Sequence, residues 1–73
     1  MEKKLLLILN EILTDKDQPV IEELNNEASL RKDLGFDSMD LAFLTAKLDE
    51  EFGIDIFEDG IVDSVGEILK KLA

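Results

Sequence analysis

The stretch DLGFDSMD, residues 33–40, carries the strongest local signals for the fold of this chain. Gly35 lets the backbone turn sharply, and Asp37 is a residue type that caps the first turn of a helix. Asp40, three residues later, can reach back to Asp37 and complete a capping box. The stretch therefore predicts a helix that begins at Asp37.

Two more helices are predicted on either side of it. The central helix should end near Glu51, because Gly53 is typical of the position just past a helix C-terminus. A last helix over residues 65–72 is expected, since Ser64 and Glu67 form a second capping box. A first helix over residues 2–13 is predicted by apolar residues that recur at helical spacing, namely Leu5, Leu6, Leu9, Ile12 and Leu13.

The two connections differ in character. Residues 14–36 form a long connection, in which we expect a short turn of helix near Ile21 to Leu24. Residues 54–62 alternate like a strand, but a lone short strand has no partner, so we favour a loop with one irregular helical turn around residues 57–60. The apolar residues expected to pin the first connection to the core are Val20, Ile21, Leu24, Ala28, Leu30 and Leu34.

Together these elements predict an all-α fold, a small bundle of three main helices plus a short irregular third helix or turn. A chain of 73 residues is expected to form one domain, residues 1–73. Apolar residues make up 45% of it, which is enough for a core and excludes a disordered chain. There is no cysteine, so no disulfide staples the fold.

The charge balance restricts the partners. Eighteen acidic residues against eight basic ones give a formal net charge of −10. This argues against nucleic acid, which needs clustered Lys and Arg, and against an anionic membrane surface. It favours protein partners that carry basic docking patches; the simpler alternative is that the acids only provide solubility.

The composition also argues against an enzyme. The chain has no His and no Cys, so it cannot build a Ser-His or Cys-His nucleophile pair. Its carboxylates have no obvious cleft in which burial could shift a pKa. The acidic segment DIFEDGIVDS, residues 55–64, fails the spacing of an EF-hand loop. We therefore expect no catalytic residue and no dedicated metal site.

No targeting or membrane segment is expected. The apolar run of residues 5–9 is shorter than the roughly 7–15 residues of a signal-peptide core and the roughly 20 of a membrane span. We expect a cytoplasmic monomer without membrane insertion.

The central helix has apolar residues on two faces. One stripe, which we assign to the core, comprises Leu41, Leu44, Thr45, Leu48 and Phe52. The roughly opposite side carries Met39, Ala42, Phe43 and Ala46. A domain of 73 residues with three helices can rarely surround one helix completely, so Met39 and Phe43 are candidates for a surface that faces a partner or cargo. The alternative is that Phe43 packs against the long connection.

Ser38 places a hydroxyl in the first turn of the central helix. Free N–H groups and the helix dipole favour a phosphate at such a position. A serine there is better suited to be modified than to attack a substrate. The alternative is that Ser38 is simply a tolerated residue of the first turn.

Residues 33–40 resemble the D-L-G-x-D-S-[LM]-D signature of the acyl carrier protein family, and the similarity extends through residues 44–53 to Val65 and Ile68. The resemblance implies that Ser38 takes a 4'-phosphopantetheine arm from coenzyme A. The thiol that a cysteine-free chain lacks would come from that cofactor, which would hold acyl groups as thioesters, sheltered among the core residues.

The resemblance also implies roles for the neighbours of Ser38. Asp37 and Asp40 would help a phosphopantetheinyl transferase to dock. The residues that would lie on the helix recognised by partners, including acyl-loading and acyl-processing enzymes, are Met39, Phe43, Ala46 and Glu50.

Three features depart from a typical fatty-acid carrier. Phe43 and Lys47 stand where an acid and a small apolar residue are usual, residues 54–63 look shortened, and Arg31-Lys32 is more basic than usual. The resemblance as a whole implies fatty-acid, polyketide or related biosynthesis, but these departures argue against primary fatty-acid synthesis. They leave room for a specialised carrier of polyketide, lipid-modification, aminoacyl or peptidyl chemistry. An unmodified helical adaptor that binds partners through the central helix is the alternative from another class.

A second Asp-Ser pair, Asp63-Ser64, looks locally like another carrier-helix entrance. Only nine residues follow Ser64, too few for a recognition helix and the rest of a bundle. We interpret Ser64 as a plain N-cap.

Overall fold

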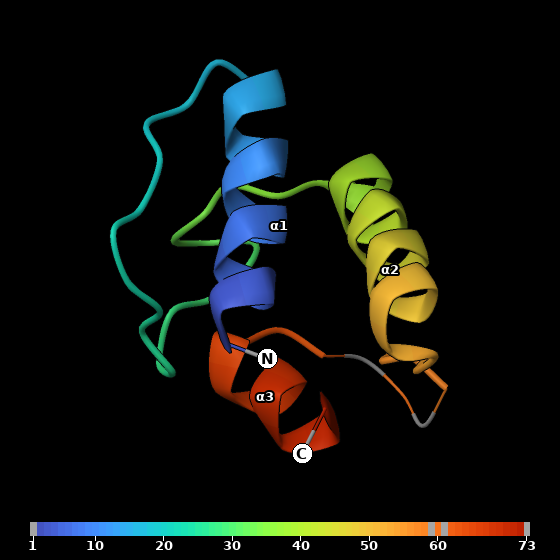
Figure 1. Cartoon of the computed structure of the whole chain (residues 1–73). Coiled ribbons are helices and arrows are strands. Elements are labelled where there is room, and N and C mark those ends of the chain that lie inside the picture. Colours follow the sequence, from blue (N-terminus) through green and yellow to red (C-terminus); the bar gives the residue numbers. More distant parts are fainter. Residues whose placement is uncertain (1, 59, 61, 73) are drawn as a thin grey trace.

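A computed structural model describes residues 2–58, 60 and 62–72 of the chain. It contains α1 (Glu2–Asp15), α2 (Ser38–Phe52) and α3 (Val65–Leu72), and no strand is found in these residues. In Figure 1, α1 and α2 lie side by side in opposite directions, and α3 lies below the end where α1 begins. The predicted all-α class and the three main helices are confirmed.

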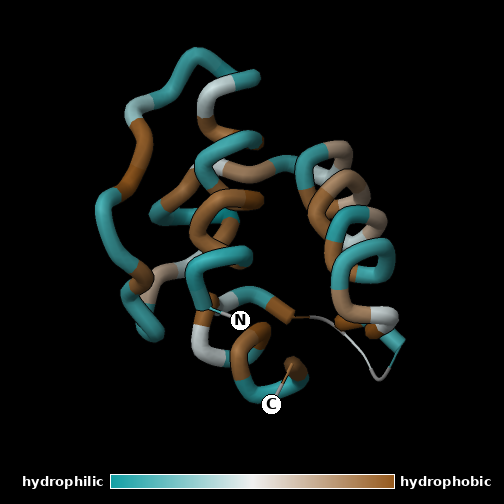
Figure 2. The backbone as a smooth tube through the Cα atoms, viewed as in Figure 1, coloured by the Kyte–Doolittle hydropathy of each residue, from teal (hydrophilic) through white to brown (hydrophobic). Residues whose placement is uncertain are grey.

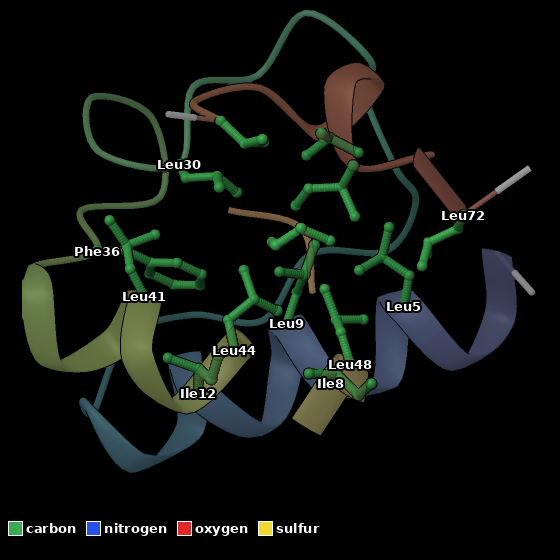
Figure 3. Close-up of a cluster of buried hydrophobic side chains, with 14 of the residues drawn as sticks. Leu5, Ile8, Leu9, Ile12, Leu30, Phe36, Leu41, Leu44, Leu48 and Leu72 are labelled. Carbon is green, nitrogen blue, oxygen red and sulfur yellow. The ribbon is translucent and has the colours of Figure 1, made fainter. Parts of the chain in front are cut away.

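The helices meet in one apolar core (Figure 3). Side chains from all three helices and both connections point into it, and Figure 2 shows the apolar stretches of the tube alternating with hydrophilic ones along each helix. The buried apolar residues are Leu5, Ile8, Leu9, Ile12, Leu13, Leu30, Phe36, Leu41, Leu44, Leu48, Ile56, Val62, Val65, Ile68 and Leu72. Within the described residues no helix is long and apolar enough to cross a membrane.

Helix α1 ends two residues later than predicted, at Asp15. Asp17 adopts a left-handed conformation with φ 62°. The Gln18 N–H then donates to the Leu13 carbonyl at 2.8 Å and the Asp17 N–H to the Thr14 carbonyl at 3.0 Å. This is the hydrogen-bond pattern of a Schellman motif, which usually has glycine at the left-handed position. Because this position holds an aspartate rather than a glycine, the sequence did not indicate where the helix ends.

The predicted turn of helix near Ile21 to Leu24 is wrong. Asn10 of α1 uses its side-chain amide to bond the backbone of Ile21 on both sides, accepting from the N–H at 2.8 Å and donating to the carbonyl at 2.9 Å. These bonds satisfy the backbone of Ile21 from outside the segment, so no local helical turn is needed. In Figure 1 this connection runs along the side of α1 that faces away from α2.

Apolar residues pin this connection to the core, as predicted, with one exception. Leu30 is fully buried, and the partly buried residues packed against the core are Ile21, Leu24, Ala28 and Leu34. Val20 is 57% exposed, so the prediction that it contributes is wrong.

In the second connection, the described residues form a turn over residues 56–58 rather than a regular helix. The Glu58 N–H donates to the Asp55 carbonyl at 3.3 Å, and the Gly60 N–H to the Phe57 carbonyl at 3.2 Å. Ile56 between them is fully buried. The irregular turn expected here is confirmed for the described residues; positions 59 and 61 lie outside them.

Helix α3 approaches the first connection very closely. The Gly66 N–H donates to the Asn26 carbonyl at 3.0 Å, and a Cβ at position 66 would lie 2.9 Å from that oxygen. Glycine is the residue that permits this contact, which fixes α3 against the connection ahead of Leu30.

Candidate functional site

The first turn of α2 is held by the capping box that the sequence predicted. The Asp37 carboxylate accepts a hydrogen bond from the Asp40 N–H at 2.9 Å, and the Asp40 carboxylate accepts one from the Asp37 N–H at 3.0 Å. Gly35, with φ 70°, makes the turn that leads into it. Ser38 is therefore the first helical residue, one position later than the predicted start.

The Ser38 side chain is exposed, and its hydroxyl has no hydrogen-bond partner among the residues the structure describes. It stands at the end of α2 where unpaired backbone N–H groups and the helix dipole favour negative charge. The hydroxyl is thus open to a modifying enzyme in a setting that suits an attached phosphate.

Ser64 stands in a very different environment. Its hydroxyl accepts from the Glu67 N–H at 3.2 Å and donates to the Glu67 carboxylate at 3.1 Å. The backbone of Ser64 also forms an isolated antiparallel β-bridge with Ser29 of the first connection. The prediction that Ser64 caps the last helix is confirmed, and its hydroxyl is committed to that structural role.

Lys16, just beyond α1, is the residue of this site that the sequence analysis missed. Its ammonium lies 2.7 Å from the Asp40 carboxylate and 4.0 Å from that of Asp37. It thereby ties the end of α1 to the start of α2. Lys16 and Asp40 are distant along the chain, and nothing in the local pattern links a lone lysine in a turn to a particular aspartate.

This contact changes how Asp40 titrates. Partial burial raises the pKa of Asp40, but the hydrogen bonds from Lys16 and from the Asp37 backbone, with the charge of Lys16, outweigh it and hold the pKa below its ordinary 3.8. The hydrogen bond to Asp40 in turn raises the pKa of Lys16 above its ordinary 10.5, against the opposing effect of burial. At neutral pH the Asp40 carboxylate and the Lys16 ammonium are therefore both charged.

We predict that Lys16→Met lowers the melting temperature at pH 7 and has little effect in acid. Because folding lowers the pKa of Asp40, the stabilisation is complete above its unfolded value and disappears as the pH falls through the folded value, below about pH 4. The pKa of Lys16 is raised, so its contribution is constant until strongly alkaline pH. Melting curves of both proteins from about pH 7 down to about pH 2 measure the difference.

The difference between the two proteins matters, because acid also relieves the self-repulsion of a chain with net charge −10. Lys32→Met is the matched control: it removes one positive charge from an exposed side chain with no ion pair in the described part of the chain. A Lys16→Met deficit that is equally large at pH 7 and pH 2 would show that the contact with Asp40 is not the cause.

The outer face of α2 is exposed along its whole length. Met39 is 81% exposed and Phe43 38% exposed, and the Lys47 ammonium lies 5.7 Å from the centre of the Phe43 ring. Ala46 and Glu50 are exposed on the same helix. Phe43 does not pack in the core, so the alternative that buried it is wrong. The face opposite Leu44 is apolar, open and close to Ser38.

An open hollow begins at Ser38 on another side of α2. It is lined by Arg31, Ser38, Leu41, Ala42, Thr45 and Phe57. A neighbouring hollow shares Ala42 and Thr45 and continues to Ala46, Asp49 and Asp55. A shallow apolar path therefore leads from the serine along α2. No group of three or more acidic, His or Cys residues within the described ranges could hold a metal ion.

Comparison with known proteins identifies the family to which the chain belongs. Residues 3–71 match the family described as "Phosphopantetheine attachment site". An acyl carrier protein of Nitratidesulfovibrio vulgaris strain Miyazaki F is 43% identical over 51 residues, 70% of this chain and 67% of that protein. The chain belongs to the acyl carrier protein family. One from Saccharopolyspora erythraea is 29% identical over 70 residues, 93% of this chain and 74% of its own length. No solved structure matches the chain significantly.

Family membership establishes the chemistry in outline. The cofactor is 4'-phosphopantetheine, covalently attached. An acyl carrier is not an enzyme, in agreement with the expectation from composition. Its partners as a class are a phosphopantetheinyl transferase and enzymes that process acyl groups.

Proposed function

We propose that Ser38 carries the 4'-phosphopantetheine arm, and that the protein presents acyl groups, held as thioesters on the arm, to enzymes of fatty-acid, polyketide or related biosynthesis. The observation that supports this most directly is the contrast between the two Asp-Ser pairs. The Ser38 hydroxyl is exposed and unbonded at the start of α2, whereas the Ser64 hydroxyl is bonded to Glu67.

The residues around Ser38 fit the cofactor. When attached, the arm supplies the thiol that a chain without cysteine lacks. In the transfer, a bond forms between the Ser38 oxygen and the phosphorus of coenzyme A that bears the pantetheine group. The pyrophosphate bond breaks, adenosine 3',5'-bisphosphate leaves, and the hydroxyl proton passes to a base of the transferase. The helix N-terminus favours the phosphodiester that results.

Asp37 and Asp40 have a double role in this proposal. Their carboxylates cap α2 and so hold Ser38 at the start of the helix. Asp37 keeps 66% of its side chain exposed, so it can also meet a basic residue of the transferase. Asp40 is only 16% exposed and already bonded to Lys16, so we assign it mainly the capping role.

Docking of the transferase and acyl-processing enzymes would use the outer face of α2. Met39 and Phe43 offer apolar contact, Ala46 lets a partner approach closely, and Glu50 offers a charge to a basic docking patch. The net charge of −10 would speed the encounter with such a patch.

We further propose that residues 1–73 act as one acyl carrier domain, monomeric and cytoplasmic. Most of the large apolar side chains of the described residues are gathered in the core, and the exposed ones, such as Met39 and Phe43, are assigned here to partner docking. The apolar run 5–9 that comes nearest to a signal-peptide core contributes Leu5, Ile8 and Leu9 to that core.

Intact mass after incubation with coenzyme A and a broad-specificity phosphopantetheinyl transferase tests the proposal. We expect the wild type to gain one phosphopantetheine, Ser38→Ala to gain none, and Ser64→Ala to be modified like the wild type. Loss of the Ser64 cap costs about 1 kcal/mol, so circular dichroism must first show that this variant is folded.

Two outcomes would overturn the proposal. A gain that persists in Ser38→Ala and vanishes in Ser64→Ala would show that the arm is attached to Ser64 and not to Ser38. No gain in the wild type, with a transferase that modifies a control carrier and with a panel of further transferases, would favour an unmodified adaptor that binds through Met39 and Phe43.

A further inference from the structure

Among the residues that the structure describes, Arg31 is the one charged residue that lines the hollow at Ser38, alongside Leu41, Ala42, Thr45 and Phe57. It is exposed, and it makes no hydrogen bond or ion pair within the described part of the chain. Lys4 and Lys16, by contrast, form ion pairs with acidic side chains. Its guanidinium is available to an anion that enters the hollow.

The helix N-terminus favours a phosphate at Ser38, but the acidic side chains nearest to it oppose one. Asp37 and Asp40 flank the serine, and the Lys16 ammonium that contacts them is already bonded to Asp40 at 2.7 Å. The far end of the path along α2 carries Asp49 and Asp55. Arg31 is thus the cation best placed to balance a phosphodiester on Ser38.

We infer that Arg31 binds the phosphodiester of the attached arm and so directs the arm across the hollow, over Leu41, Ala42 and Phe57. This inference rests on the proposed attachment at Ser38. Guanidinium groups bind phosphate oxygens through two parallel N–H donors, which fixes direction as well as distance. Arg31 is a positioning residue here: it sets where the arm rests between partners and does not take part in acyl transfer.

The path along α2 suits the rest of the arm. Its walls are apolar at Leu41, Ala42 and Phe57. The Thr45 hydroxyl donates a hydrogen bond to the Leu41 carbonyl at 2.8 Å, which leaves the Thr45 methyl group for contact with the arm. The acidic end at Asp49 and Asp55 repels a phosphate but not the uncharged amides and thioester that follow it. The charge distribution therefore gives the arm one favoured direction.

NMR of nitrogen-15-labelled protein in the apo and holo forms tests the inference. Holo protein is made from coenzyme A with the transferase and checked by mass, for the wild type, Arg31→Gln, Arg31→Lys and Lys32→Gln. Lys32→Gln is the matched control, since it removes the adjacent exposed cation that does not line the hollow.

In the wild type and Lys32→Gln we expect amide shift changes on modification at Ala42, Thr45 and Phe57 as well as beside Ser38. Arg31→Gln should lose the changes at these three distant positions, and Arg31→Lys should retain part of them. The phosphorus-31 shift of the arm should differ between wild type and Arg31→Gln at low salt. That difference should shrink at about 1 M salt, where the Debye length is about 3 Å.

The inference fails if holo Arg31→Gln shows the same distant changes as holo wild type, or if the wild type shows none. Failure of the underlying proposal looks different, because then no holo protein forms on Ser38 at all and the mass does not change.

Discussion

Leu44→Ala is expected to remove a large fraction of the stability of the fold. Leu44 is fully buried at the centre of α2, among the side chains that α1 and Phe36 bring into the core. Truncating such a leucine costs about 2–5 kcal/mol, from lost apolar burial plus the cavity left behind. A domain of this length has a free energy of unfolding on the order of 4–11 kcal/mol. The loss should lower the melting temperature by at least about 10 °C.

Urea titration followed by far-ultraviolet circular dichroism measures this effect, since the chain has no Trp or Tyr for fluorescence. Leu7→Ala is the matched control, because it makes the same change on α1 at a side chain that is 69% exposed. It should change the free energy of unfolding by no more than about 0.5 kcal/mol. Near-equal losses for the two variants would contradict the burial of Leu44 described here.

The parts of the fold that were predictable from the sequence depend on local interactions. The start of α2 follows from Asp37 and Asp40, and the start of α3 from Ser64 and Glu67, because capping bonds join residues three positions apart. The end of α2 follows from Gly53, whose φ of 67° suits glycine. The candidate serine was identifiable for the same reason, since its turn lies inside one short segment.

The parts that were missed depend on contacts between distant residues. The bonds from Asn10 to Ile21 decide the path of the first connection, and no local pattern announces them. Lys16 reaches Asp40 across the bundle in the same way. The late end of α1 was missed for a different and local reason, because Asp17 takes a conformation that usually belongs to glycine.

The exposed face of α2 leads to the second large effect that we predict, a loss of partner recognition without loss of fold. A few residues usually carry most of the binding energy of an interface, each costing more than about 1–2 kcal/mol when truncated, and Phe and Met are enriched at interfaces. Met39→Ala and Phe43→Ala should therefore each lower the kcat/KM for modification by the transferase by about tenfold or more. Their melting temperatures should stay close to that of wild type, since neither residue is in the core.

The time course of holo formation, followed by intact mass at substrate concentrations below KM, measures kcat/KM for each variant. Leu7→Ala again serves as the control, because it removes a similar exposed apolar side chain from α1, away from Ser38. It should be modified at the wild-type rate. If Met39→Ala and Phe43→Ala were also modified at that rate, docking would rest on the acidic side chains alone. If Leu7→Ala were modified as slowly as Met39→Ala and Phe43→Ala, the partner would cover α1 as well. The recognition surface would then extend beyond the outer face of α2.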